Sequence, residues 1–240
     1  MKSIRVNIAH YNEDLSWLQS LQELKCELLI YEKNTNLKYY RDYVKLNDNQ
    51  IALCNIGREA HTYLTHIVHH YDDLRDYEVF LQGRVDDHIN GSIMAHLKEM
   101  YEKEMKHISW CSPEKTKIGC YNDEVYQSIR TQYPDHKHIN QFYPPYGTRD
   151  YLLFKEIFPD LEYPSVPYFF NSFALFGVKK EVIHFYSKSF YERLLNYFNP
   201  KYINFLNIST DEFIICMGYG FEVLWDFIFK HAVNELNKNI

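Results

Sequence analysis

The chain has 240 residues, of which 46% are hydrophobic, and its formal net charge is −6. This length suffices for one domain with a sizeable core, and the apolar content excludes a disordered chain. The negative charge weighs against a nucleic-acid partner, because such binders need a basic surface to displace counterions.

Three apolar stretches predict buried strands, namely IRVNIA at residues 4–9, CELLIYEK at 26–33 and the run VFL at 79–81. Residues 51–53 form a shorter apolar stretch. Apolar residues at helical spacing follow the first strand, where Asn12 or Asp14 can cap a helix, and follow the glycine turn in NIGRE, residues 55–59. This alternation of strand and helix predicts a mostly parallel sheet.

The remaining chain divides into three parts. Residues 110–165 are rich in proline, tyrosine and polar residues and predict long loops with short helices. FFNSFALFGVKKEVI then predicts a strand, a turn and a helix start, and residues 211–236 predict a helix that contains Gly218 and Gly220. Together the elements predict a single α/β domain over residues 1–240, with a mostly parallel sheet flanked by helices.

Two aspartates and a histidine follow the strand at 79–81, in the sequence RVDDH. Open α/β sheets bind their ligands at the carboxyl ends of the strands. Asp86 and Asp87 there offer oxygen ligands of the kind that Mg²⁺ and Mn²⁺ prefer, and His88 stands beside them. The alternative is an ordinary surface turn.

A second candidate site combines NIGRE with the polar end of the first strand. A glycine at a helix start exposes backbone N–H groups, and Arg58 adds a fork for phosphate or carboxylate. With Tyr11, Asn12 and Glu13 nearby, these features predict a nucleotide pocket. The alternative is a plain helix entry with Arg58 in solvent.

Histidines and acids in the helices add further candidates. His66, His69 and His70 have a spacing that can bind zinc, but exposed histidines on an amphipathic helix are the favoured interpretation. Glu222 lies among large apolar residues in GFEVLWDFIF. A carboxylate is costly there unless it has a partner or a role, so Glu222 is a candidate base.

The compartment is inferred from the cysteines and the apolar runs. The five cysteines form no C-x-x-C pair, which indicates free thiols in a reducing compartment. The N-terminus lacks the apolar run of a signal peptide, and no stretch of 18 apolar residues occurs. We therefore expect a cytoplasmic protein, with peripheral contact to a membrane surface left open.

Motifs spread over nearly the whole chain resemble a family of bacterial and fungal proteins of unknown function that is related to GT-A-fold glycosyltransferases. These motifs are YNEDLSWL at 11–18, NIGREAHTYLTHI at 55–67, VFLQG at 79–83 followed by Asp87 and His88, FALFGV at 173–178, FYERLL at 190–195, and Glu222 with Trp225.

The resemblance implies a GT-A-like fold and transfer of a sugar from a nucleotide-diphosphate sugar, expected to be uridine-linked. The acceptor would be a glycan or glycolipid, as in capsule or surface polysaccharide assembly. The implied donor-binding residues are Tyr11, Asn12, Glu13, Arg58, Gln82 and Asp86.

The resemblance also implies a metal and a catalytic base. Asp87, with His88 or Asp86, would hold Mn²⁺ or Mg²⁺, although RVDDH departs from a strict D-x-D motif. Glu222 or Asp211 would deprotonate the acceptor hydroxyl.

Two other functions remain open for the same residues. The first is a metal-dependent hydrolase that uses the aspartates and histidines. The second is a glycan-binding module without catalysis, because a fold does not by itself decide a function.

Overall fold

In the computed structural model, the described residues are 2–86, 89, 91–110, 117–119, 131, 157–160, 168–170, 174–199 and 210–238. Their main feature is a seven-stranded mixed sheet in the order β3-β4-β2-β1-β5-β9-β6. The strands β1 (Ile4–His10), β2 (Glu27–Glu32), β4 (Gln50–Ala52) and β5 (Tyr77–Gln82) run parallel to one another in its centre. The strands predicted from the sequence are therefore confirmed, and the chain has an α/β fold.

Antiparallel strands complete the sheet on both sides. The strand β3 (Val44–Lys45) pairs with β4 at one edge. At the other edge β9 (Phe176–Lys179) pairs with β5, and β6 (His107–Ser109) pairs with β9. A separate antiparallel pair is formed by β7 (Lys117–Gly119) and β8 (Tyr168–Phe170).

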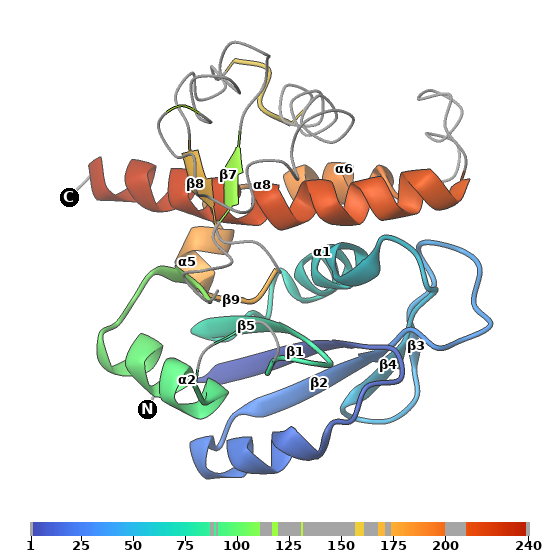
Figure 1. Cartoon of the computed structure of the whole chain (residues 1–240), viewed down its shortest axis with the longest axis horizontal. Helices are drawn as coiled ribbons and strands as arrows, with labels where there is room; N and C mark the ends of the chain where they lie inside the picture. Colours follow the sequence, from blue (N-terminus) through green and yellow to red (C-terminus); the bar gives the residue numbers. More distant parts are fainter. Residues whose placement is uncertain are drawn as a thin grey trace.

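Helices cover both faces of the sheet (Figure 1). One face carries α1 (Arg58–His70), α5 (Lys180–Ile183), α6 (Lys188–Asn196) and the long α8 (Thr210–Lys238). The other face carries η1 (Ser16–Leu24) and α2 (Ile93–Glu102). Both faces are buried, so the central strands can be apolar along their whole length.

The element after β1 differs from the expected α-helix. The structure has a 3₁₀-helix, η1, whose N-cap residue Leu15 makes no side-chain cap hydrogen bond. Asp14 instead accepts hydrogen bonds from the backbone N–H and the hydroxyl of Ser16, at 2.9 and 2.8 Å. Asp14 therefore closes a local turn and does not cap a helix, as its short side chain readily does.

The helix α8 is anchored to the sheet by aromatic side chains. Phe221, Trp225 and Phe229 follow one another at intervals of four residues and are all buried. The rings of Trp225 and Phe229 stack, and both lie within 5.5 Å, between ring centroids, of Phe176 on β9. This aromatic packing fixes the position of Glu222 beside the start of α1.

Within the described ranges, no helix has both the length and the apolarity that a bilayer crossing needs. The predicted loops at 110–165 fall mostly outside the described residues.

Candidate functional site

The strand order changes direction at the carboxyl ends of the parallel strands. From β1 the chain continues through η1 to β2 on one side, while α1 leads from β4 to β5 on the other side of β1. Two neighbouring strands whose connections leave in opposite directions create a topological switch point, where α/β proteins bind ligands. The switch point between β1 and β5 is the candidate functional site.

Glu13 lies at this switch point, three residues after the end of β1. Its Oε2 accepts hydrogen bonds from the backbone N–H groups of Tyr11, at 2.7 Å, and Asn12, at 3.1 Å. The carboxylate packs directly against Gly83, which follows β5. Burial raises the pKa of Glu13, but the backbone N–H groups outweigh it, so the net pKa lies below its ordinary value. Glu13 is therefore an ionised acceptor at neutral pH.

Hydrogen bonds link Glu13 to the neighbouring strand ends. His10, the last residue of β1, lies 2.8 Å from Glu32 Oε2 through Nδ1 and 3.1 Å from the Glu13 carbonyl oxygen through Nε2. The amide of Asn34 donates to Asn12 Oδ1 at 2.7 Å. The loops after β1 and β2 are thus held together at the switch point.

The turn before α1 is held by a buried lysine. Gly57 and Arg58 both have positive φ angles, +59° and +50°, and only glycine adopts that region without strain. Lys33 donates to the carbonyl oxygens of Ile56, at 2.6 Å, and Arg58, at 2.7 Å. Burial lowers the pKa of Lys33 to about 8, although Cys54 and Glu59 act in the opposite direction.

Arg58 reaches from this turn across to α8. The stem of its side chain lies against Gly218, where an added Cβ would stand 2.9 Å from Arg58 Cδ. Its guanidinium lies 3.6 Å from a carboxylate oxygen of Glu59 and 4.0 Å from one of Glu222. Arg58 is 42% exposed, whereas both glutamates are buried. Gly218 therefore leaves room for the exposed Arg58 side chain to reach two buried carboxylates.

The structure brings most of the predicted donor-binding residues to this edge. Tyr11, Asn12 and Glu13 follow β1, and Gln82 ends β5 beside them, paired with Ala9. Arg58 contacts Glu222, as described above. Asp86 is exposed in the turn after β5.

The two candidate bases lie far apart on one helix. Asp211 is in the first turn of α8, and its side chain lies outside the described residues. It precedes Glu222 by 222 − 211 = 11 positions, about 16 Å along a helix. The two carboxylates therefore cannot both act on the same atom.

The predicted metal ligands Asp87 and His88 also lie outside the described residues. Among the residues that are described, no three His, Cys, Asp or Glu side chains form a group that could hold a metal ion. The described part thus supplies no ligand set for Mn²⁺ or Mg²⁺, and the metal stays a prediction about Asp87 and His88.

Sequence reasoning missed Lys33 and Gly218 as members of the site. The sequence could have indicated Lys33, because this lysine follows the apolar run CELLIYE at the carboxyl end of a predicted strand. Gly218 had a weaker signal, since a glycine inside a helix often marks the close approach of another group.

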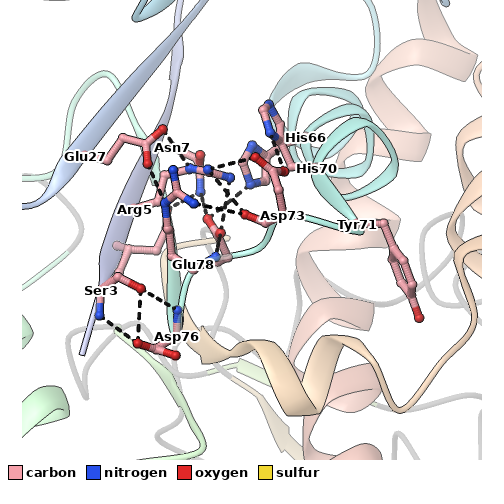
Figure 2. Close-up of polar contacts among 12 residues, drawn as sticks. Ser3, Arg5, Asn7, Glu27, His66, His70, Tyr71, Asp73, Asp76 and Glu78 are labelled. Atoms are coloured by element: carbon pink, nitrogen blue, oxygen red, sulfur yellow. Dashed lines mark hydrogen bonds and ion pairs between the residues drawn. The ribbon is translucent and has the colours of Figure 1, made fainter. Parts of the chain in front are cut away.

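A second polar group lies toward the amino ends of β1 and β5 (Figure 2). Glu78 on β5 is fully buried and lies 3.1 Å from His66 Nε2 and 3.5 Å from Arg5 Nη1, while Asn7 donates to it at 2.8 Å. Tyr31 approaches the other ring nitrogen of His66 at 2.7 Å. The charged members pair with one another, as buried ionic groups must, although Asn7 Oδ1 has no hydrogen-bond partner among the described residues. This group joins the three strands β1, β2 and β5 to α1.

That arrangement corrects the interpretation of the histidines. His66 is fully buried, and only His69 is exposed as expected, while His70 is intermediate. The prediction of exposed histidines was wrong for His66, because Glu78 and Tyr31 on the sheet offer it partners.

The comparisons with known proteins give one result. A family model described as "Protein of unknown function (DUF3431)" matches residues 6–239. Neither the curated proteins nor the solved structures contain a match.

Proposed function

We propose that this chain, which belongs to the DUF3431 family, is a glycosyltransferase with a GT-A-like fold. It would move a sugar from a nucleotide-diphosphate sugar, expected to be uridine-linked, to a glycan or glycolipid acceptor in surface polysaccharide assembly. The observation that carries this proposal is the switch point between β1 and β5, where the ionised Glu13 follows β1 and the exposed Arg58 begins α1 after β4.

The donor would bind at the carboxyl ends of the parallel strands. Arg58, the first N–H groups of α1 and the buried charge of Lys33 suit the negative diphosphate. Glu13 suits the hydroxyl groups of a ribose, because an ionised carboxylate accepts hydrogen bonds from hydroxyls. The Tyr11 ring is 45% exposed, and we expect it to stack on the nucleobase.

Glu222 is the proposed base, with Asp211 as the alternative. The Glu222 carboxylate lies beside Arg58 and hence beside the place proposed for the diphosphate. An ionised carboxylate there would accept the proton of the acceptor hydroxyl as the new C–O bond forms. The Mn²⁺ or Mg²⁺ expected on Asp87 and His88 would neutralise the leaving diphosphate, and none of the roles given to Glu13, Arg58 and Glu222 depends on it.

The test is a thermal-shift screen of nucleoside diphosphates and nucleotide sugars, with and without Mn²⁺. A ligand at a hundred times its dissociation constant stabilises the folded state by about 2.7 kcal/mol, which is readily measured. We expect a uridine nucleotide to stabilise the wild type and expect Arg58→Ala and Glu13→Gln to lose most of that effect. Arg193→Ala removes an exposed arginine on α6, which is not part of the proposed donor site, and should respond like the wild type.

Each rival function predicts a different result. Stabilisation by no nucleotide under any metal condition would make the transferase proposal wrong. Rapid turnover of the nucleotide sugar without any acceptor would favour the hydrolase. Stabilisation by glycans alone, with no response to nucleotide or metal, would favour the binding module.

A further inference from the structure

Four buried side chains face one another between α1 and α8, next to Arg58. Glu59 and Tyr63 are one turn apart on α1, and Glu222 and Trp225 are one turn apart on α8. Their exposed fractions are 6, 0, 4 and 1%. The guanidinium of Arg58 lies within 4.0 Å of both carboxylates, and the rings of Tyr63 and Trp225 have centroids 6.3 Å apart. We refer to these four residues as the α1–α8 polar group.

Three polar atoms of this group have no hydrogen-bond partner among the described residues. They are Glu59 Oε1, the hydroxyl of Tyr63 and Trp225 Nε1. Buried polar atoms are normally paired, because leaving one unpaired costs about 1–3 kcal/mol. Burial raises the pKa of Tyr63, and Glu59 and Glu222 raise it further, so its hydroxyl remains a protonated donor. The group thus offers two donors and one acceptor to a missing partner.

The mixture of donors and acceptors restricts the chemistry of that partner. An anion would be repelled by the carboxylates of Glu59 and Glu222, and Arg58 already brings a cation to them. An alcohol hydroxyl can donate to a carboxylate and accept from an O–H or N–H group at the same time. Aromatic rings beside such donors also suit a ligand that is partly apolar. A sugar combines these properties.

We propose that the α1–α8 polar group is a hydroxyl-binding subsite for the transferred sugar, in which Glu59 accepts hydrogen bonds from the sugar and Tyr63 and Trp225 donate to it. The proposal rests on the proposed function, because it puts the sugar beside the diphosphate held by Arg58. Glu222 borders the same subsite, which leaves the base next to the reacting carbon. Because Arg58 is the exposed neighbour of the group, the sugar reaches it by displacing that side chain toward the diphosphate.

The experiment compares three variants of the full chain by thermal shift. Tyr63→Phe removes one hydroxyl, and Glu59→Gln removes one charge while preserving the volume. The matched control is Tyr77→Phe, since the Tyr77 hydroxyl is also buried and unpartnered among the described residues but lies on the opposite face of the sheet. Each protein is measured with uridine diphosphate, with a panel of uridine diphosphate sugars and with free methyl glycosides.

The expected result is a loss of affinity for the nucleotide sugar but not for uridine diphosphate. Tyr63→Phe and Glu59→Gln should bind uridine diphosphate like the wild type but bind the matching nucleotide sugar about tenfold more weakly. Tyr77→Phe should bind both ligands normally. Equal sugar affinity in all four proteins would overturn the subsite and leave the transferase proposal standing, as expected if a buried water occupies the group.

The remaining outcomes separate the two proposals. If glycosides stabilise the wild type but no nucleotide does, the transferase proposal fails, and loss of glycoside binding in Tyr63→Phe alone still supports the subsite. If neither ligand class stabilises the wild type, both proposals are overturned.

Discussion

At the scale of single residues, a buried imidazole links stability to pH. His61 on α1 is fully buried, and its Nε2 donates to the carbonyl oxygen of Tyr40 at 2.6 Å. Burial lowers the pKa of His61 from 6.5 to about 3, and the nearby charge of Lys33 lowers it as well. Between these two values the unfolded chain binds more protons than the folded one. The free energy of unfolding should therefore fall as the pH is lowered from 6.5 toward 3.

The variant His61→Gln retains a hydrogen-bond donor and cannot titrate. Its unfolding free energy, measured with urea at several pH values, should fall less steeply in this window, by up to about 1.4 kcal/mol per pH unit. His69→Gln changes an exposed histidine of the same helix whose pKa is also lowered by burial, but less than that of His61, so it should flatten the slope less than His61→Gln does. Equal slopes in wild type and His61→Gln would mean that this imidazole is not what couples stability to pH.

What the sequence predicts at this scale depends on where a residue's partners come from. Glu222 stands in an apolar run, so its burial and its need for a partner follow from the sequence alone, and both are confirmed by its position beside Arg58. His66 shows helical spacing only. Its burial depends on Glu78, a charged residue inside an otherwise apolar strand on another element.

At the scale of elements, the contact of α1 with α8 depends on one glycine. Gly218→Ala should favour the helix by about 1 kcal/mol of intrinsic propensity. The new methyl group would, however, stand 2.9 Å from Arg58 Cδ and displace that side chain. We expect a folded protein of similar stability that responds weakly to nucleotides in the thermal-shift screen.

A suitable comparison for Gly218→Ala is Asn234→Ala, which adds an alanine at an exposed position of the same helix. It should bind nucleotides like the wild type. Normal nucleotide binding by Gly218→Ala itself would show that the position of Arg58 does not govern the site.

The central strands were predictable because they are short apolar runs, and α1 because its apolar residues recur at helical spacing. The strand β6 was not predictable, because three residues are too few to show a pattern. The 3₁₀ geometry of η1 was not predictable either, because its apolar spacing also fits an α-helix. The antiparallel direction of β9 was also hidden, since a strand's own sequence does not state its neighbour's direction.

At the scale of the whole molecule, the two ends of the central strands carry different polar groups. The carboxyl end carries the candidate site, whereas the amino end carries the buried group of Arg5, Asn7, Glu78 and His66. We expect Arg5→Met to destabilise the protein by about 3–5 kcal/mol, because it leaves the buried Glu78 with an uncompensated charge.

This loss is measured by urea unfolding, and the double variant Arg5→Met/Glu78→Leu should recover part of it. Nucleotide affinity measured well below the unfolding temperature should be unchanged in Arg5→Met. Additive losses in the double variant would contradict the account of paired charges, and a large change in affinity would contradict the separation of the two ends.

The pairing of β6 with β9 determines how much the length of the chain between these two strands can vary without disturbing the sheet. Ser109 pairs with Phe176, and the backbone N–H of Trp110 donates to the Leu175 carbonyl oxygen at 2.8 Å. The chain therefore leaves the sheet and re-enters it at adjacent positions. Trp110 and Leu175 thus hold together the two ends of the chain between them, in which Ile157 and Phe158 lie in the core. The entropy of joining two such ends grows only slowly with the length of the chain between them. We therefore expect that inserting a few residues between these ends would leave the pairing of β6 with β9 unaltered.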